Sequence, residues 1–474
     1  MVSHLRFCAV SSASMILFAG CTSPFDETAY QDWHQFRSRT MEHDANVSLL
    51  SDQTAVGNGS ASTSINGTTS EEFIRYALEH NPDVAAAFHQ WRTAAERSPQ
   101  AGALPDPKLT LGVFLDEVET RVGPQQARLG ISQSFPWPGT LRSRADAASR
   151  AADAAWLQLE STRLRVRQRV VNAIHELAYL DAATHIASEN LDLLQSIEEI
   201  VRAKYRVGTG SHPQLMRVQV ELGQLEDRLV QLHSMRPAYT AELNAALNRA
   251  ADSDVPELPT TPTVRVDADA ESLITLALQY NQILLSLDKQ TEQQHLLVEA
   301  ARLDGLPQFT AGIDYIFTGE AMDSSIAESG DDPVMVSLGV SLPLWREKYN
   351  AGVREAFAKQ LSLLSERQSQ SNSLAARIHR VYFDHTDADR RAALYQDTLI
   401  PKAEESLQAT LTGFRAGESS LTDVLDTERT LLDFAIALER ARADQNIAFA
   451  ELESLVGTSI PTRSNGQVQS EVKP

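Results

Sequence analysis

The chain has 474 residues, of which 42% are hydrophobic and only 6% aromatic, and its formal net charge at pH 7 is -21. This charge argues against nucleic acid as a partner, because phosphate backbones require a basic surface. The length would allow two or three ordinary domains, but the Ala-, Leu-, Glu- and Arg-rich composition suits long helices better than thick cores.

The first residues have the pattern of an export signal. An apolar stretch from Phe7 to Ala19 has the length of the hydrophobic part of a signal peptide and is too short to span a bilayer as a helix. It ends in Leu17-Phe18-Ala19-Gly20-Cys21, which resembles the bacterial lipobox. The resemblance implies a lipoprotein signal peptide over 1–20, acylation of Cys21 and, because Thr22 follows, sorting to the outer membrane. An incidental Cys after an ordinary signal peptide is the alternative.

The segment after the signal has a flexible composition. Residues 21–70 include the Gly-, Ser- and Asn-rich run 57–64, which predicts a lipidated, flexible leader between the lipid and the first helix. The second cysteine, Cys8, would be removed with the signal peptide, so no disulfide is expected.

Two long segments lack helix-breaking residues. Positions 141–207 contain neither Gly nor Pro, and a helix rising about 1.5 Å per residue would make them a rod of roughly 100 Å. A second such run, from Val353 to Ile400, continues past Pro401 to Thr412. Rods of this length favour a conduit or strut over an enzyme with a pocket.

Short sequences recur in order at an offset of about 200 residues, which predicts an internal duplication. Ala77-Leu78-Glu79-His80-Asn81 returns as Ala277-Leu278-Gln279-Tyr280-Asn281, Leu129-Gly130-Ile131-Ser132 as Leu338-Gly339-Val340-Ser341, and Tyr205-Arg206-Val207-Gly208 as Phe414-Arg415-Ala416-Gly417. We therefore expect one repeat over 70–260, a second over 261–457 and a polar, mobile tail over 458–474. Chance similarity between helical sequences is the alternative.

Four segments alternate between apolar and other residues. They run over Leu109–Leu115, Leu129–Ile131, Phe309–Phe317 and Val334–Leu342. No run of eighteen apolar residues occurs, so a bilayer crossing would have to use strands, and about ten residues suffice for each. Four strands cannot close a barrel and an open edge does not persist in lipid, so a barrel would be shared between protomers. Taken singly, each run also fits a soluble sandwich.

Narrow apolar stripes on the rods predict packing against neighbouring helices. One stripe comprises Ala187, Leu191, Leu194, Ile197, Val201 and Tyr205, and another comprises Val424, Leu431, Ala435 and Leu438. A simple coiled-coil dimer would use the same stripes.

Three motifs carry a family resemblance. They are Gly130-Ile131-Ser132-Gln133-Ser134-Phe135-Pro136-Trp137-Pro138-Gly139, its partner Val340-Ser341-Leu342-Pro343-Leu344-Trp345, and the run from Gly413 to Asp426. Over about 70–457 the chain resembles the TolC-type outer-membrane efflux channels, the outer membrane factors. Pro136, Trp137, Pro138, Gly139, Pro343 and Trp345 would form the strand-to-helix passages, with the tryptophans at the membrane interface.

The resemblance implies a mostly α fold with a membrane β-barrel. Three internally duplicated protomers would form a twelve-stranded barrel, four strands each, continued by a long α-helical periplasmic tunnel. The implied partners are the homotrimer, a periplasmic adaptor, an inner-membrane pump of the resistance-nodulation-division (RND) type and outer-membrane lipid. The run from Phe135 to Gly139 is similar to the branch serving heavy-metal pumps, so heavy-metal cations are the expected substrate.

The helical tip is the expected gate. Gly413 and Gly417 are expected to end the second rod, and Pro401 to kink it. Gly208 and Gly210 reverse the chain in the first copy, where no earlier Pro occurs in the rod. We therefore expect the second hairpin alone to kink and close.

Two carboxylates follow the second tip at a helical spacing. Asp423 and Asp426 lie three residues apart, and threefold symmetry would arrange them as two stacked acidic rings that attract cations. Both match the family's periplasmic constriction, and Phe414 matches its aromatic gate residue. Ser419 departs from members that carry an Arg there. Without the resemblance, a solvated helix face is the ordinary interpretation.

Enzymatic motifs and cofactor sites are not expected. His175-Glu176 begins like a zinc-protease helix, but Tyr179 stands where the second His is required. His379 and His385 are six residues apart, on different helix faces, and are expected to be exposed surface residues. The alternatives to a channel are a periplasmic coiled-coil scaffold or adaptor lipoprotein without a pore and, third, a metal-binding enzyme.

Overall fold

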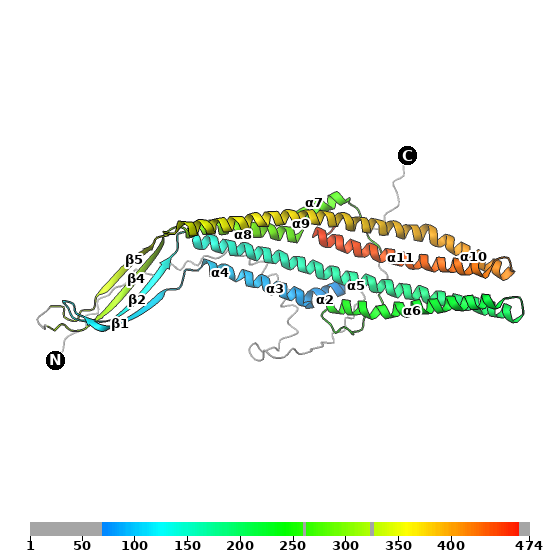
Figure 1. The fold of residues 1–474 in the computed structure, drawn as a ribbon, viewed down its shortest axis with the longest axis horizontal. Helices are drawn as coiled ribbons and strands as arrows, with labels where there is room; N and C mark the ends of the chain where they lie inside the picture. The colour runs from blue at the N-terminus through cyan, green and yellow to red at the C-terminus, as the bar shows by residue number, and fades with distance from the viewer. Residues whose placement is uncertain (1–68, 259–261, 323–326, 464–474) are drawn as a thin grey trace.

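The computed structural model describes residues 69–258, 262–322 and 327–463 (Figure 1). The expected signal peptide, Cys21 and all but the end of the leader lie outside the described residues. The molecule is elongated, with a sheet at one end and two helical hairpin tips at the other (Figure 1).

Two helical rods run along the molecule, as predicted. Helix α5, Thr140–Arg206, has 67 residues without interruption. In the second copy the rod consists of α9 (Arg346–Leu394), the π-helix η1 (Tyr395–Leu399) and α10 (Ile400–Ala416). Within the described part of the chain, no helix is both long enough and apolar enough to cross a membrane.

The remaining helices occur in a similar order in the two copies. The first copy contains α2 (Ser70–His80), α3 (Pro82–Ala95), α4 (Arg97–Gly102) and α6 (His212–Ala246), and the second contains α7 (Ala270–Tyr280), α8 (Gln282–Asp304) and α11 (Leu421–Val456). Helix α3 and the short α4 of the first copy stand in the place of α8 in the second.

The duplication extends to individual hydrogen bonds. Asn81 separates α2 from α3, caps α3 through the amide of Asp83, and donates from Nδ2 to the carbonyl oxygen of Ala246 at 2.8 Å. Asn281 caps α8 in the same way and donates to the carbonyl oxygen of Leu455 at 2.8 Å. Both amides are buried, so each interrupted helix is tied to the end of the returning helix of its own copy.

The four predicted strands form one antiparallel sheet. They are β1 (Lys108–Val118), β2 (Gln125–Phe135), β4 (Gln308–Thr318) and β5 (Val334–Ser341), in the order β1-β2-β4-β5. The β2–β4 pairing joins the two copies, with Ile131 opposite Ile313. Strands β1 and β5 are the edges of this sheet.

The sheet exposes its apolar face. Leu111 is 70% exposed, Leu115 is 96% exposed and Leu338 is 84% exposed. On the opposite face Gly130, Gly312 and Asp314 are buried. A sheet in a soluble domain shows the reverse arrangement, so this one presents to its surroundings the side chains that avoid water.

Short passages connect the sheet to the rods. Pro136, Trp137 and Pro138 lead to Gly139, whose φ of 95° places it in the left-handed region before α5. The Trp137 ring stacks on Phe309 with centroids 6.1 Å apart. Between β5 and α9 the passage contains Pro343 and Trp345, and the Trp345 side chain is exposed.

The predicted apolar stripes form the core of the tip half. Leu194, Ile197 and Val201 of α5 are buried together with Val218 of α6 and Val424 of α11. Ala187 and Leu438 are buried too, and Leu191, Leu431 and Ala435 are partly buried. Tyr205 is an exception. It lies in the last turn of α5, is exposed, and contacts the His212 ring across the turn.

The start of the expected polar tail belongs to the fold, so that prediction was wrong for 458–463. Ile460 is buried in the core beside α7 and α11. Thr462–Arg463 form strand β6, which pairs with β3 (Arg265–Val266). The segment that leads into α7 contains β3, the partner strand of β6. This pairing and the burial of Ile460 fix residues 458–463 against the rest of the fold.

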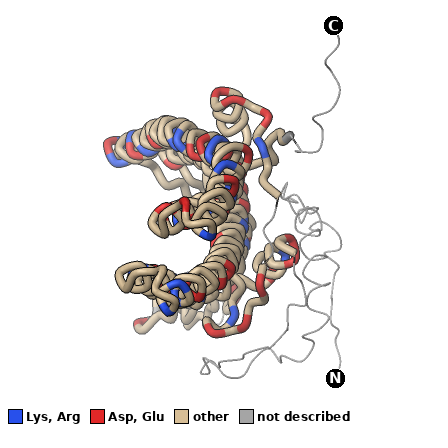
Figure 2. Tube along the Cα trace, turned by 90° about the vertical axis from the view of Figure 1, so that its right-hand side faces the viewer, with Lys and Arg blue, Asp and Glu red and all other residues tan. Residues whose placement is uncertain are grey.

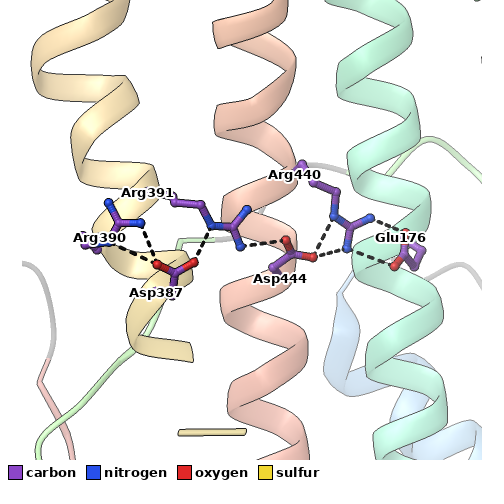
Figure 3. Close-up of polar contacts among 6 residues, drawn as sticks. All are labelled: Glu176, Asp387, Arg390, Arg391, Arg440 and Asp444. Carbon is purple, nitrogen blue, oxygen red and sulfur yellow. Dashed lines mark hydrogen bonds and ion pairs between the residues drawn. The ribbon is translucent and has the colours of Figure 1, made fainter. Parts of the chain in front are cut away.

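A chain of alternating charges links helices α5, α9 and α11 (Figure 3). Arg440 of α11 contacts Glu176 of α5 at 2.7 Å and Asp444 at 2.6 Å, and Arg391 of α9 bridges Asp444 at 3.2 Å and Asp387 at 3.0 Å. Arg390 contacts the other oxygen of Asp387. Burial opposes the charge of Arg440, but its two carboxylate partners outweigh this and raise its pKa. Because these pairs are half-buried, the cost of desolvating the charges offsets much of their attraction.

Candidate functional site

The helical tips are the candidate site, and the end view shows acidic and basic residues mixed along the helices that form them (Figure 2). In the second copy α10 continues through Gly413 and ends at Ala416, with Gly417 at a φ of 86°. The expectation that Gly413 ends the helix was wrong. Its carbonyl oxygen accepts the amide of Glu418 at 2.7 Å, and a Cβ at this position would collide with Ser419 Oγ. Gly413 allows the close approach of Ser419, and Gly417 adopts the left-handed conformation of the turn itself.

The first tip turns as predicted. Helix α5 ends at Arg206, Gly208 has a φ of 78°, and α6 begins at His212. A Cβ at Gly210 would come within 3.0 Å of the backbone nitrogen of Tyr205, so this turn also depends on the missing side chain.

At the position of the predicted kink, a widened π-helical turn lies immediately before Pro401. The π-helix Tyr395–Leu399 precedes it, and the amide of Ile400 donates to the carbonyl oxygen of Tyr395, five residues back. Proline has no amide hydrogen and crowds the preceding turn, so a wider turn there relieves the clash. The corresponding rod of the first copy, α5, has no such interruption.

Asp423 is committed to the start of α11. Its Oδ2 accepts the amide of Ser420 at 3.0 Å, and its own amide donates to Ser420 Oγ at 3.2 Å. This reciprocal cap lowers the pKa of the Asp423 carboxyl, mainly through the hydrogen bonds from Ser420. Asp426 lies one turn further and is exposed, with Arg217 of α6 at 4.0 Å.

The Phe414 side chain faces the core between the helices of the tip. Its side chain is buried in the tip core, and Lys204 Nζ lies 4.0 Å from the ring centroid and donates to the Phe414 carbonyl oxygen at 2.6 Å. The structure therefore brings Phe414 together with α5 of the first hairpin, whereas Asp423 and Asp426 remain at the surface.

Ion pairs between α6 and α11 extend the contact between the hairpins. Glu221 pairs with Arg429, and Arg228 pairs with Asp433 at 3.0 Å. Sequence reasoning missed these pairs. The charges recur at helical spacing in both segments, but matching them requires knowing that α6 and α11 lie side by side.

A buried carboxyl lies at the junction of the hairpins and was also missed. Glu428 of α11 is 2% exposed and accepts a hydrogen bond from Asn190 Nδ2 of α5. Burial raises its pKa to about 7; the Asn190 bond and Arg429 oppose this, and Glu221 and Asp433 add to it. A signal existed, because position 428 falls four residues after Val424 of the predicted stripe and four residues before the buried Leu432.

His379 and His385 have different surroundings. His379 is exposed, 3.5 Å from Glu271, but His385 is buried and its Nε2 lies 3.0 Å from the Val264 carbonyl oxygen. The prediction that His385 is exposed was therefore wrong, since the chain entering α7 covers it. Burial lowers the pKa of His175 to about 4. Among the residues with a described position, no three potential ligands gather.

The family model described as "Outer membrane efflux protein" matches residues 73–249 and 273–458. Among similar proteins, the outer membrane protein TolC of Vibrio cholerae is 24% identical over 413 residues, covering 84% of this chain and 93% of the relative. The cobalt-zinc-cadmium resistance protein CzcC of Cupriavidus metallidurans is 22% identical over 377 residues, covering 78% and 85%. The pyoverdine export outer membrane protein OpmQ of Pseudomonas putida is 24% identical over 412 residues, covering 82% and 85%.

Solved structures share the fold. CusC superposes with a TM-score of 0.71 at 15% identity, covering 83% of this chain and 93% of CusC. VceC of Vibrio cholerae gives a TM-score of 0.67 at 18% identity, covering 82% and 96%.

Glu428 predicts a pH dependence of stability. Because its pKa is raised on folding, folding favours the protonated carboxyl, and stability is lost as the pH rises from its ordinary value of 4.5 through about 7. Glu428→Gln should raise the thermal midpoint of the detergent-solubilised protein at pH 8 by about 2–4 °C and leave it nearly unchanged at pH 4.5. The exposed Glu405→Gln is the control and should shift neither. A Glu428→Gln variant less stable than the native chain at pH 8 would show that the ionised carboxylate stabilises the junction.

Proposed function

This chain belongs to the outer membrane efflux protein family, and from that premise we propose that three copies of it form the exit duct of a tripartite RND-type efflux system. The chain is an efflux channel and not an enzyme. The duct would conduct passively, receiving substrate from an inner-membrane pump through a periplasmic adaptor.

The observation that carries the proposal is the exposed apolar face of the sheet. Strands β1 and β5 are open edges, and the outward side chains of both, such as Leu111 and Val336, are 70% exposed. Backbone groups in lipid require partners, so β5 of one copy would pair with β1 of the next until three copies close twelve strands. A coiled-coil scaffold has no use for such a sheet.

Two substrate classes have support. CzcC is named for cobalt, zinc and cadmium resistance, and the acidic pair at the second tip would favour cations, so we propose heavy-metal cations. OpmQ is named for pyoverdine export, which makes an organic solute the second candidate. Susceptibility of a deletion strain to a panel of metal salts and organic toxicants separates the two, because only the class carried by the duct should become more toxic.

We also propose that Cys21 is acylated and anchors the chain to the outer membrane. The support is the lipobox-like run that ends at this residue. Metabolic labelling with palmitate should mark the native chain and leave Cys21→Ser unlabelled. Equal labelling of both would place the lipid elsewhere.

If the chain forms this channel, the purified protein should have three properties. The full chain should fractionate with the outer membrane, migrate as a heat-modifiable trimer and carry stable current in planar bilayers. A soluble periplasmic monomer without conductance would support the scaffold instead.

We propose that Asp423 and Asp426 form the cation-attracting rings at the tip, with Phe414 packed behind them. Asp423→Asn with Asp426→Asn should lower the K⁺ over Cl⁻ permeability ratio about two- to threefold, because each ring loses its charges at short range. Asn keeps an oxygen for the Ser420 amide, so the cap of α11 should survive. Asp252→Asn, on an exposed loop, is the control. Unchanged selectivity in a conducting trimer would remove these residues from the gate.

A further inference from the structure

We propose that Arg128 and Asp314 form a charged collar inside the sheet-built section of the duct, where the guanidinium group is the partner that passing solutes meet. The inference rests on the proposed function, since it requires the face opposite the exposed apolar side chains to line the pore.

The pair joins the two copies of the repeat. Arg128 lies on β2 and Asp314 on β4, which are paired in the sheet but connected by no local turn. The contact is bidentate: Nε donates to Oδ1 at 2.9 Å, and the second guanidinium nitrogen lies 2.8 Å from Oδ2. A planar fork on a carboxylate is the most directional ion pair available to a protein, so both side chains are held in one orientation.

The sheet is built around this carboxylate. Gly130 is directly opposite Asp314 in the β2–β4 register, and a Cβ at Gly130 would collide with Asp314 Oδ1. On the other side Gly112 of β1 stands opposite Arg128, where an added Cβ would meet nothing within 4 Å. Gly130 therefore makes room for the Asp314 carboxylate, and Gly112 leaves open space beside Arg128.

Small residues occupy part of the same face, and two larger apolar residues flank the pair, Ile316 opposite Arg128 and Met335 opposite Asp314. The register aligns Ser132 of β2 with Gly312 of β4, and Gly312 with Ser337 of β5. Lys108 of β1 lies on this face too, but Arg128 is held in one orientation by its bond to Asp314 and so contributes a fixed positive charge there.

The two partners are unequally exposed, which gives the collar its direction. The side chain of Arg128 is 44% exposed and that of Asp314 only 10%. Three copies around a pore would thus present three guanidinium edges and conceal three carboxylates. Solute carboxylates and phosphates can hydrogen-bond to such edges, whereas a cation meets an acid that is already neutralised. The outer section would then favour anionic groups, in contrast to the acidic rings proposed at the tip.

The test is the reversal potential of single trimers in planar bilayers under a KCl gradient. Arg128→Gln leaves Asp314 unpaired and should raise the K⁺ over Cl⁻ permeability ratio about two- to threefold. Asp314→Asn frees the guanidinium and should lower the ratio by a similar factor. Shifts in the same direction, or no shift in either variant, would overturn the collar.

A charge-swapped variant separates the collar from a structural brace. Arg128→Asp with Asp314→Arg can restore the bond between the strands but places the acid at the exposed position. The collar predicts heat-modifiable trimers with a raised K⁺ over Cl⁻ ratio. Native selectivity in these trimers would mean that the pair only braces the sheet, and would overturn the proposal.

A matched control lies in the connecting loops. Arg121 and Glu328 also pair across the two copies, at 3.1 Å, but their side chains are 70% and 65% exposed. Arg121→Gln should change selectivity less than Arg128→Gln, since solvent screens it. An equal shift would show that any surface charge suffices and would overturn the collar. A native trimer that carries no current would refute the proposed function, whereas a conducting native trimer with unresponsive variants refutes the collar alone.

Discussion

The structure depends on a sheet whose apolar face and edge-strand backbone groups find no partners within a single chain. Four strands expose apolar side chains on one face and unpaired backbone groups along β1 and β5. The apolar face is unfavourable in water, and the unpaired backbone groups of the edge strands are unfavourable in lipid. A single copy of the sheet is therefore unstable in either environment. The long helices meet the related constraint that a rod has little interior, and they bury their stripes only by lying beside other rods.

Much of this fold is readable from the sequence because its signals are local and repeated. The unbroken run before Val207 predicts α5, and alternation over Val334–Leu342 predicts β5. Asn81 and Asn281 are visible as repeated residues, but their matching bonds to the ends of α6 and α11 appear only in three dimensions. Periodicity locates elements, and the partners of a buried amide depend on which elements lie together.

The errors in prediction have a common cause. Gly413 is a residue type common at helix ends, yet here the returning chain brings Ser419 close to its backbone. His385 has the spacing of a surface residue, yet the chain entering α7 covers it. Ile460 lies in a polar sequence but fills a gap beside α7. In each case a segment distant in sequence decides the environment, and Glu428 at the hairpin junction is the same effect for a charged residue.

The widened turn at Tyr395–Leu399 has a consequence beyond the proline that it accommodates. One extra residue in a turn rotates everything downstream by about 100° around the helix axis. Helix α10 therefore presents a different side to its neighbours than the uninterrupted end of α5 does. If three copies assemble as proposed, the two repeats would lose their approximate equivalence at this level, and two unlike hairpins would alternate around the threefold axis at the tip.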